Sequence, residues 1–471
     1  MDRNLNLYLP VFIAGACSLL VEIAGGRLIA PYVGTGIFTW AAVIGLVLGA
    51  LSIGYYMGGR WADQHRSADE LGKIFLIAAV ATLAVPFLFR LVGPLTLPLE
   101  LAPAALLASS VLIPASLLYG MISPYAIKLA VQKDQEGQVA GSIFALSTMG
   151  SIIGVLGTGF LLIPNMQLTH VFILAALAML VASWLVTRKF QITDTIVFVV
   201  LAVFISSLSF AYYPGDILYE SDSAYYHITV VDGDYAGQPA RLLLLNDALS
   251  TGERDGQPAF GYMLVGRIGY LFAGNPQSAL VIGTGAGAQV EDLKAIFPEI
   301  EVDGIEIDPQ VIEAGKRFFS LQEDARTHII IEDARRYLQT TEHSYDIIVV
   351  DVFRGKNIPS HLATVEAVAE MKQHLRPDGV VVVNLISAVE GERSMPFQLI
   401  RNAYGANFEH VLALPLHPME REQVQNIVLI ATDKDTSYLE AQLGPALYPE
   451  EPSGSPLPTD EWNPLDVYQL R

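Results

Sequence analysis

Three glycines alternate with small residues in the segment ALVIGTGAGAQV, namely Gly283, Gly285 and Gly287. The residues before them read as a buried strand and those after them as a helix, so the glycines form the connecting loop. Glycine lets a backbone approach a ligand closely, and a helix N-terminus favours a polar or anionic group. Glu306 follows Gly285 by 21 residues, at the end of the next predicted strand, where a carboxylate can accept both hydroxyls of a ribose. The arrangement predicts a nucleoside site.

The spacing of the glycines indicates which kind of nucleoside. A glycine loop alone is weak evidence, because many such loops are only tight turns. Here the loop lies between a strand and a helix and is followed by a second strand, which favours the nucleoside interpretation. The pattern is GxGxG rather than GxGxxG, and this favours an S-adenosylmethionine-type cofactor over NAD.

Two aspartates follow the next predicted strands. Asp333, with Ala334 after it, ends a third strand in IIIEDARRYL, where its carboxylate can reach the amino group of an adenine. Asp351 ends a fourth strand in YDIIVVDVF. Ligands of an open parallel sheet bind beyond the carboxyl ends of the strands, so these side chains are expected to lie with Gly285 and Glu306. The alternative for a single aspartate is a helix cap or a surface turn.

The first part of the chain is built differently. The sequence is 52% hydrophobic, and its apolar residues are concentrated before about residue 213. A helix that crosses a bilayer needs about 20 predominantly apolar residues. Seven stretches are long enough, at approximately 8–30, 37–59, 73–92, 103–130, 139–163, 168–187 and 195–213.

Charged and small residues within these stretches carry further expectations. Glu22 and Arg27 lie in or near the first stretch, where charge is costly, so they form either a structural ion pair or part of a pathway. Cys17 is the one cysteine of the chain, which excludes an intrachain disulfide. Three pairs of glycines predict seams where helices pack closely: Gly45/Gly49, Gly54/Gly58 and Gly150/Gly154.

Charge divides the chain at the same place. Residues 1–213 carry a net charge of +1, and residues 214–471 carry a net charge of −21. A nucleic-acid partner is not expected, because binding nucleic acid requires a basic face. An acidic domain instead attracts cations such as polyamines or a sulfonium, although solvation explains the charge equally well. His227, His361 and His410 lack metal-ligand spacing, so no metal is expected.

The loops between the predicted spans differ in charge. Those near Arg60, Lys128 and Arg188 are basic, and the alternate loops carry almost no charge. Basic loops stay in the cytoplasm, which places the C-terminal domain outside after seven crossings. Adenosylated cofactors are made in the cytoplasm, so the side that this domain faces stays open. The chain is expected in the cell membrane as a multi-pass protein, with the lipid bilayer as a partner.

The chain resembles the polyamine aminopropyltransferases, in particular the multi-pass membrane spermidine synthase-like proteins, over nearly its whole length. The strings EIAGGRLIAPYVG and AGSIFALSTMGSIIG carry the resemblance in the apolar half, and SAYYHITVV and LLLLNDALSTGERD carry it in the other half. The resemblance implies an α-helical membrane domain of about seven spans, a small β-subdomain and an α/β Rossmann-like domain of the class I S-adenosylmethionine-binding type. Their expected bounds are 1–213, 214–265 and 266–471.

The resemblance also implies a reaction. In this family a neutral amine attacks the methylene carbon beside the sulfonium of decarboxylated S-adenosylmethionine, and methylthioadenosine leaves. By resemblance, Glu306 binds the ribose, Asp333 binds the adenine, and Asp351 is the base or orients the amine. The chemistry needs little beyond placement and one such carboxylate. The expected partner is a small-molecule amine, and a homodimer is left open.

Several family positions have changed, and the changes bear on the acceptor. Ala286 replaces the loop aspartate that meets the cofactor's amino group, and Arg354 replaces a second aspartate of the catalytic segment. Tyr226 and Ser250 replace glutamines of the diamine groove, and Asn246 replaces an aspartate. An arginine where the second ammonium of a diamine binds opposes putrescine, so the acceptor is expected to be a different amine.

Two other functions fit the same residues. The same sheet hosts S-adenosylmethionine-dependent methyltransferases, so methyl transfer to a lipid or membrane-embedded acceptor is the first alternative. The second is a transporter or sensor whose nucleoside domain binds its ligand without turnover. The products distinguish them: methylthioadenosine indicates propyl transfer, S-adenosylhomocysteine indicates methyl transfer, and binding without either product indicates the transporter or sensor.

Overall fold

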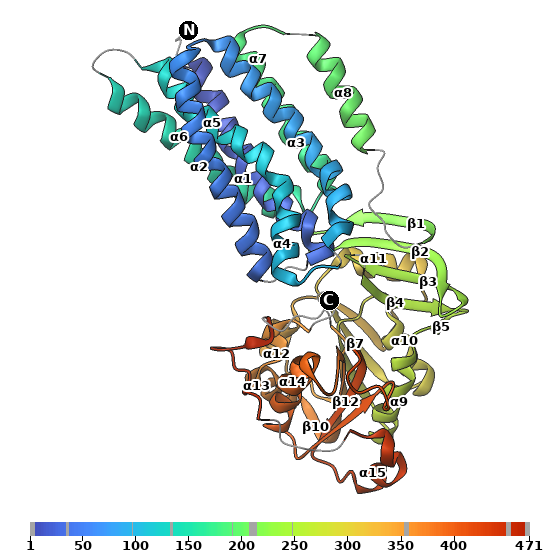
Figure 1. The fold of residues 1–471 in the computed structure, drawn as a ribbon. Coiled ribbons are helices and arrows are strands. Elements are labelled where there is room, and N and C mark those ends of the chain that lie inside the picture. Colours follow the sequence, from blue (N-terminus) through green and yellow to red (C-terminus); the bar gives the residue numbers. More distant parts are fainter. Residues whose placement is uncertain are drawn as a thin grey trace. The chain divides into compact units, whose positions relative to one another are not determined.

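The chain divides into two compact units. The computed structural model describes residues 5–33, 37–96, 98–131, 135–190, 192–206, 214–246, 248–352, 358–448 and 454–466. One unit comprises Met1–Phe210 with Asp222–Ala224, and the other comprises Ala211–Ser221 with Tyr225–Arg471. Figure 1 shows that the first unit is helical and that the second contains β-sheets with helices.

Six segments of the helical unit are long and apolar enough to cross a membrane, as counted over the described residues. Six of the seven predicted stretches thus form apolar helices of the length that a membrane crossing requires. The seventh falls on α8 (Ile192–Ser206), an apolar helix of 15 residues that is shorter than the other six. The six are α1 (Leu5–Val33), α2 (Ile37–Gln64), α3 (Ala68–Thr96), α4 (Leu101–Ser109) with α5 (Ile113–Ala130), α6 (Glu136–Gly157) with a π-helical turn at Thr158–Leu162, and α7 (Leu168–Thr187).

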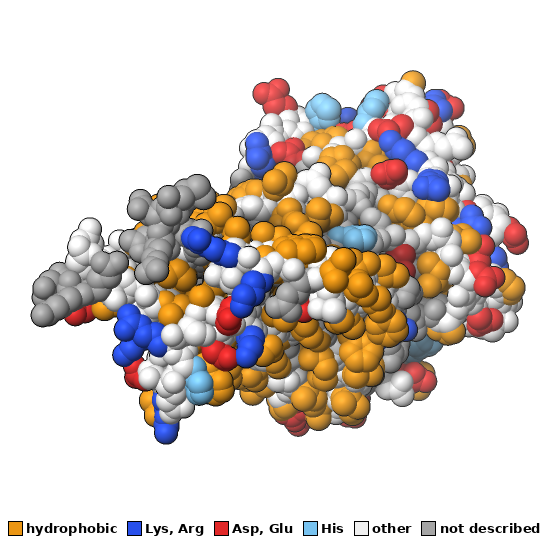
Figure 2. All heavy atoms as spheres, turned by 90° about the horizontal axis from the view of Figure 1, so that it is seen from above, with side chains coloured by type: hydrophobic (Ala, Val, Ile, Leu, Met, Phe, Trp, Pro, Cys, Tyr) orange, Lys and Arg blue, Asp and Glu red, His pale blue; other side chains and the backbone are white. Residues whose placement is uncertain are grey.

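Large apolar side chains are exposed on the outside of these helices. Ile53, Leu156 and Phe160 are examples, and Phe160 is 82% exposed. Figure 2 shows hydrophobic side chains spread widely over the face in view. Extended apolar surface is unfavourable in water but not against lipid tails. The helical unit therefore has the surface expected of a membrane protein.

Two of the three predicted glycine seams are confirmed. A Cβ atom at Gly150 would lie 2.1 Å from a backbone oxygen of α1, and one at Gly54 would lie 2.1 Å from a backbone oxygen of α5. None of the described atoms lies within 4 Å of a Cβ atom placed on Gly45 or Gly49. That predicted seam is wrong, because the spacing of small residues does not say which face of α2 meets a neighbouring helix.

The second unit begins with a small antiparallel sheet. It has five strands in the order β1-β2-β3-β4-β5. Neighbours from β2 to β5 are antiparallel, so this part of the chain is a series of hairpins. The strands are β1 (Gly215–Asp222), β2 (His227–Tyr235), β3 (Gln238–Leu245), β4 (Ala248–Arg254) and β5 (Gln257–Pro258).

The larger sheet has seven strands in the order β11-β12-β10-β9-β6-β7-β8. β12 is antiparallel to β10 and β11, so the sheet is mixed. The strands are β6 (Ser278–Ile282), β7 (Glu301–Glu306), β8 (Thr327–Ile331), β9 (Tyr345–Val350), β10 (Leu375–Ser387), β11 (His410–Pro415) and β12 (Gln425–Thr432). The helices of this unit are α9 (Gly261–Phe272), α10 (Ala288–Ile296), α11 (Pro309–Phe318), α12 (Ala334–Thr340), α13 (Val365–Gln373), α14 (Met395–Gly405) and α15 (Ser437–Leu443).

The order of the strands shows where a ligand is expected. β6 is the first strand of this sheet in the chain, and it pairs in parallel with both β7 and β9. Every residue of β6 is buried, as expected for a strand covered on both faces. β7, which follows β6 in the chain, lies on one side of β6, and β9, which follows β8, lies on the other side. The boundary between the neighbouring strands β6 and β9 is therefore a topological switch point. Sheets of this kind bind ligands there, beyond the carboxyl ends of the strands. The predicted α/β fold class is confirmed.

Candidate functional site

The glycine loop between β6 and α10 has a backbone that favours glycine at three positions. Gly283, Gly285 and Gly287 have φ angles of +85°, +55° and +94°. A Cβ atom at Gly283 would lie 2.4 Å from the carbonyl oxygen of Asp351, and one at Gly287 would lie 2.6 Å from the side chain of Leu321. Glycine is therefore required here both by conformation and by the close approach of neighbouring segments.

Glu306 ends β7, and its carboxylate lies against the glycine loop. Oε2 accepts a hydrogen bond from the N–H of Gly285 at 3.0 Å, and Oε1 accepts from the N–H groups of Ile307 and Asp308 at 2.9 and 3.2 Å. The residue is 7% exposed. Burial raises the pKa of Glu306 to about 7, against the opposing effect of the backbone hydrogen bonds. A buried acceptor thus stands beside the loop, at the place predicted for a ribose.

Asp333 caps α12 with one oxygen and faces a different partner with the other. Oδ1 accepts from the N–H groups of Arg335 and Arg336 at 3.0 and 3.2 Å. Oδ2 lies 3.3 Å from Nε2 of His361. Ala334 follows as the first residue of α12. The helix-cap interpretation therefore holds for Oδ1, whereas Oδ2 faces His361 and its contact with an adenine stays a prediction.

Asp351 follows β9 and is held by three neutral donors. Its Oδ2 accepts from the hydroxyl of Tyr262 at 2.8 Å and from Nε2 of Gln289 at 2.9 Å. Its Oδ1 accepts from Nδ2 of Asn384 at 2.8 Å. Burial raises the pKa of Asp351, and the three hydrogen bonds lower it by smaller amounts. A fixed carboxylate with a raised pKa is suited to accept a proton from a ligand.

Four residues that support Asp351 were not identified from the sequence: Tyr262, Gln289, Asn384 and Asn426. Asn426 supports it indirectly, since its Nδ2 donates to Oδ1 of Asn384 at 3.0 Å. Asn384 had a recognisable signal, because it is a polar residue in the otherwise apolar run VVVVNLI. Gln289 had a weaker one, its place in the first turn of the helix after the glycine loop.

Two of the predicted acceptor residues lie near the glycine loop. Oγ of Ser250 lies 3.7 Å from the position of a Cβ atom on Gly285. Its neighbour Thr251 accepts from the N–H of Ala286 at 3.2 Å. Tyr226 is buried in the same apolar cluster as Ala286. The small sheet therefore contributes side chains close to the loop.

The other two altered positions named above are Asn246 and Arg354. Oδ1 of Asn246 accepts from the backbone N–H of His227 at 2.9 Å, which stabilises the connection between β3 and β4 against the start of β2. Arg354 lies outside the described residues. Among the described residues, no group of three His, Cys, Asp or Glu side chains could hold a metal ion.

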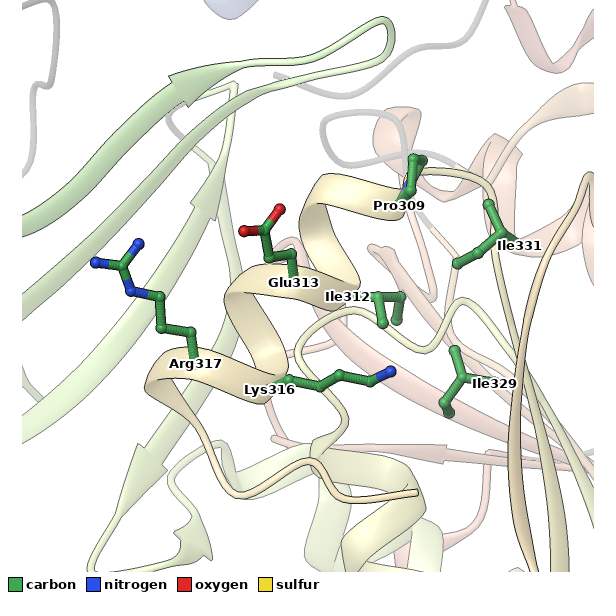
Figure 3. A pocket seen from close by; sticks show the side chains of 7 residues that line it. All are labelled: Pro309, Ile312, Glu313, Lys316, Arg317, Ile329 and Ile331. Carbon is green, nitrogen blue, oxygen red and sulfur yellow. The ribbon is translucent and has the colours of Figure 1, made fainter. Parts of the chain in front are cut away.

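A hollow of about 570 Å³ lies elsewhere on this unit, between α11 and the edge strand β8. Figure 3 shows Ile329 and Ile331 of β8 opposite the side chains of α11. Lys316, a charged residue of its lining, pairs with Glu323. Glu323 also accepts from the N–H of Ile329 at 3.0 Å, so one donor of the sheet edge is occupied. The lining includes none of the predicted site residues.

Comparisons with known proteins agree with the predicted family. Residues 262–415 match the spermine/spermidine synthase domain. A polyamine aminopropyltransferase of Vibrio vulnificus is 37% identical over 131 residues, which cover 27% of this chain and 44% of that protein. Polyamine aminopropyltransferase 2 of Aquifex aeolicus is 22% identical over 402 residues, which cover 81% of this chain and 79% of that protein.

Among solved structures, a probable spermidine synthase from Corynebacterium glutamicum is similar with a TM-score of 0.44 and 22% identity. The match covers 54% of this chain and 97% of that one. The chain spans less than half the length of the Vibrio relative. The chain is thus similar to polyamine aminopropyltransferases, with a match to the spermine/spermidine synthase domain over residues 262–415 and, in the described residues before it, six helices long and apolar enough to cross a membrane.

Proposed function

We propose that the second unit transfers an aminopropyl group from decarboxylated S-adenosylmethionine to an amine. The observation that carries the proposal is a pair of carboxylates at one edge of the sheet, with Glu306 bound to the glycine loop and Asp351 adjoining Gly283. A buried acceptor beside a glycine loop fits a ribose. A carboxylate whose donors among the described residues are neutral fits an incoming ammonium.

On this proposal the nucleoside is bound by residues of three strand ends. Glu306 accepts hydrogen bonds from the ribose hydroxyls, and Oδ2 of Asp333 accepts from the adenine amino group with Ala334 beside it. The glycine loop lets the backbone approach the nucleoside closely. S-adenosylmethionine carries the same adenosine, so these contacts bind the nucleoside without selecting the group that is transferred.

Asp351 supplies the base. It takes a proton from the acceptor's ammonium and passes it to solvent, which frees the lone pair of the nitrogen. The nitrogen attacks the methylene carbon beside the sulfonium, so that a C–N bond forms and the C–S bond breaks. The electron pair of the broken bond stays on sulfur, and neutral methylthioadenosine leaves. A carboxylate beside the sulfonium would lose its attraction as the positive charge disappears, so a carboxylate on the amine side contributes more to the rate.

Product analysis tests the proposal against its alternatives. The purified full-length protein is offered decarboxylated S-adenosylmethionine or S-adenosylmethionine, each with a panel of amines, and the products are identified by mass spectrometry. Methylthioadenosine together with an aminopropylated amine supports the proposal. S-adenosylhomocysteine indicates a methyltransferase. Retained nucleoside binding without either product indicates a transporter or sensor.

Putrescine is expected to be a poor acceptor. The described groups that bind Asp351 are a phenol and two amides, and none of them matches a second ammonium as a carboxylate would. Asp460 of the terminal segment is engaged elsewhere, since it pairs with Arg335 and accepts from Thr364 at 2.7 Å. An amine panel checks this expectation by comparing kcat/KM for putrescine with that for monoamines and for amines that bear a carboxylate.

Arg354 provides the variant for this test. Arg354→Asp is expected to raise kcat/KM for putrescine by about tenfold or more, the effect of one hydrogen bond to a charged group. Arg326→Asp is the control, because Arg326 pairs with the exposed Glu299 on a different part of the unit. Efficient use of putrescine by the unmodified protein would contradict the assigned role of Arg354 in acceptor choice.

We also propose that the second unit faces the side of the membrane opposite the basic loops. Arg188 follows the last residue of α7, and the apolar helix α8 comes next in the chain before the second unit begins. A crossing by α8 would therefore put the second unit on the side opposite the basic loops. Basic loops stay in the cytoplasm, and the nucleoside would then reach the site from the other side.

Labelling of added cysteines in intact cells tests this facing. Cys17 is the one native cysteine and is 3% exposed, so it gives little background. With a membrane-impermeant maleimide, Glu342→Cys on the second unit is expected to react in intact cells. Gln64→Cys at the end of α2 is expected to react only after permeabilisation. The reverse pattern for Glu342→Cys would place the second unit in the cytoplasm.

A further inference from the structure

The two oxygens of Asp351 are bound unequally. Oδ2 accepts two hydrogen bonds, from Tyr262 and Gln289, whereas Oδ1 accepts one, from Asn384, within the part of the chain that the structure describes. A carboxylate oxygen offers about two acceptor positions. Oδ2 is therefore filled, and Oδ1 keeps one position for a ligand.

Gln289 is itself fixed behind Oδ2. Its Oε1 accepts from the hydroxyl of Tyr270 at 2.5 Å, and both residues are buried. The amide oxygen is engaged by the phenol, so the amide nitrogen faces Asp351. Tyr262 and Tyr270 both belong to α9. This helix thus supports Oδ2 twice, directly through Tyr262 and indirectly through Gln289.

Asn384 is fixed in the same way at Oδ1. Its own Oδ1 accepts from Nδ2 of Asn426 at 3.0 Å, and this orients its amide nitrogen toward Asp351. Asn384 lies in β10 and Asn426 in the neighbouring strand β12, where the two strands are paired. Rotation of the Asp351 carboxylate is therefore opposed by groups from α9, α10 and β10, which are well separated in the sequence.

We propose that Gln289, supported by Tyr270, is a positioning residue that holds Asp351 with Oδ1 toward the acceptor amine. The proposal rests on the function proposed above for the same site. Reacting groups must be held in a near-attack geometry, and a displacement of about 1 Å can cost about 10²-fold in rate. Gln289 lies behind the carboxylate, so it acts through Asp351 and is not expected to touch the substrate. Asn384 lies beside the open position of Oδ1, so it is expected to affect acceptor binding.

Kinetics of the full-length protein test the role of Gln289. Gln289→Leu is expected to lower kcat by about 10–100-fold and to leave KM for the nucleoside within about twofold. The lost donor had stabilised the charged carboxylate, so the acid limb of the kcat–pH profile should move by about one unit toward higher pH. Tyr270→Phe should also lower kcat and move the acid limb toward higher pH, in both cases by a smaller amount. This variant replaces Gln289→Leu in the test if Gln289→Leu does not fold. Gln442→Leu, at an exposed position of α15, is the control and should match the unmodified protein.

A measurement that does not depend on turnover tests the positioning role of Gln289 separately from the proposed transferase function. Difference infrared spectroscopy follows protonation of the Asp351 carboxyl, whose band is identified by its loss in Asp351→Asn. A higher titration midpoint in Gln289→Leu supports the positioning role even if the protein transfers no aminopropyl group, and then the proposed function alone fails. An unchanged midpoint in Gln289→Leu overturns the positioning role, whether or not the transferase activity is found.

Discussion

Asp351→Asn is expected to lower the rate of aminopropyl transfer by about 10²–10⁴-fold, the usual contribution of a positioned general base. Asparagine keeps the size of the side chain and can still meet the donors around it in part, but it cannot take a proton from the acceptor. Affinity for the nucleoside should change little, because Glu306 and Asp333 are the groups assigned to the adenosine. Steady-state kinetics with calorimetry of nucleoside binding measure the two quantities separately.

A matched variant is the control for this result. Asp378→Asn makes the same chemical change at an exposed, irregular position near the start of β10, where the residue has a positive φ of 62°, a conformation that asparagine tolerates well. Its turnover should equal that of the unmodified protein. Normal turnover by Asp351→Asn would show that this residue is structural, and the proton would then need another acceptor.

Glu306→Ala is expected to weaken nucleoside binding by about 1.5–3 kcal/mol, the range for hydrogen bonds to a charged group. The reason is the position of its carboxylate, which accepts from the N–H of Gly285 and stands where the ribose hydroxyls are expected. Calorimetry with methylthioadenosine checks the value. Unchanged affinity would remove the ribose assignment. If NAD bound more tightly than decarboxylated S-adenosylmethionine, S-adenosylmethionine and methylthioadenosine, the predicted cofactor class would be contradicted.

The pH dependence of binding gives an independent check of the same residue. Burial raises the pKa of Glu306 from 4.5 to about 7, so the folded protein without nucleoside loses stability as pH rises from about 4.5 to about 7. Ribose hydroxyls donate to the ionised carboxylate, so affinity for methylthioadenosine should increase as pH rises through about 7. Glu306→Gln cannot ionise and should abolish this increase. An equal pH dependence in Glu306→Gln would assign the effect to a different group.

The sequence predicted the parts of the site that depend on local structure. Gly283, Gly285 and Gly287 lie between a buried strand and a helix, and each adopts the positive φ that explains a glycine there. Glu306 and Asp351 were identified because each stands at the end of a predicted strand, and both strands are parallel to β6 in the structure. For Asp333 the helix-cap interpretation is confirmed, since one oxygen caps α12, whereas the other oxygen faces His361 and its contact with an adenine stays a prediction.

The supporting residues could not be predicted, because their roles depend on long-range packing. Gln289 and Asn384 meet at Asp351 only when α10, β9 and β10 are assembled. Nothing in the local sequence specifies that meeting. The same limit explains the glycine seams, where Gly45 and Gly54 have the same spacing pattern but only Gly54 contacts another helix. The seventh apolar stretch stays a prediction, because its residues 207–213 lie outside the described residues that follow α8.

Transfer of a labelled aminopropyl group tests the central claim most directly. The full-length protein is incubated with decarboxylated S-adenosylmethionine labelled with ¹³C in the aminopropyl chain, with a panel of amines and with Asp351→Asn in parallel. We predict that the label appears in an amine in equal amount to the methylthioadenosine released, and that Asp351→Asn reduces both together. Tight binding of the labelled nucleoside with no label in any amine, or release of S-adenosylhomocysteine when S-adenosylmethionine is supplied instead, would contradict the account.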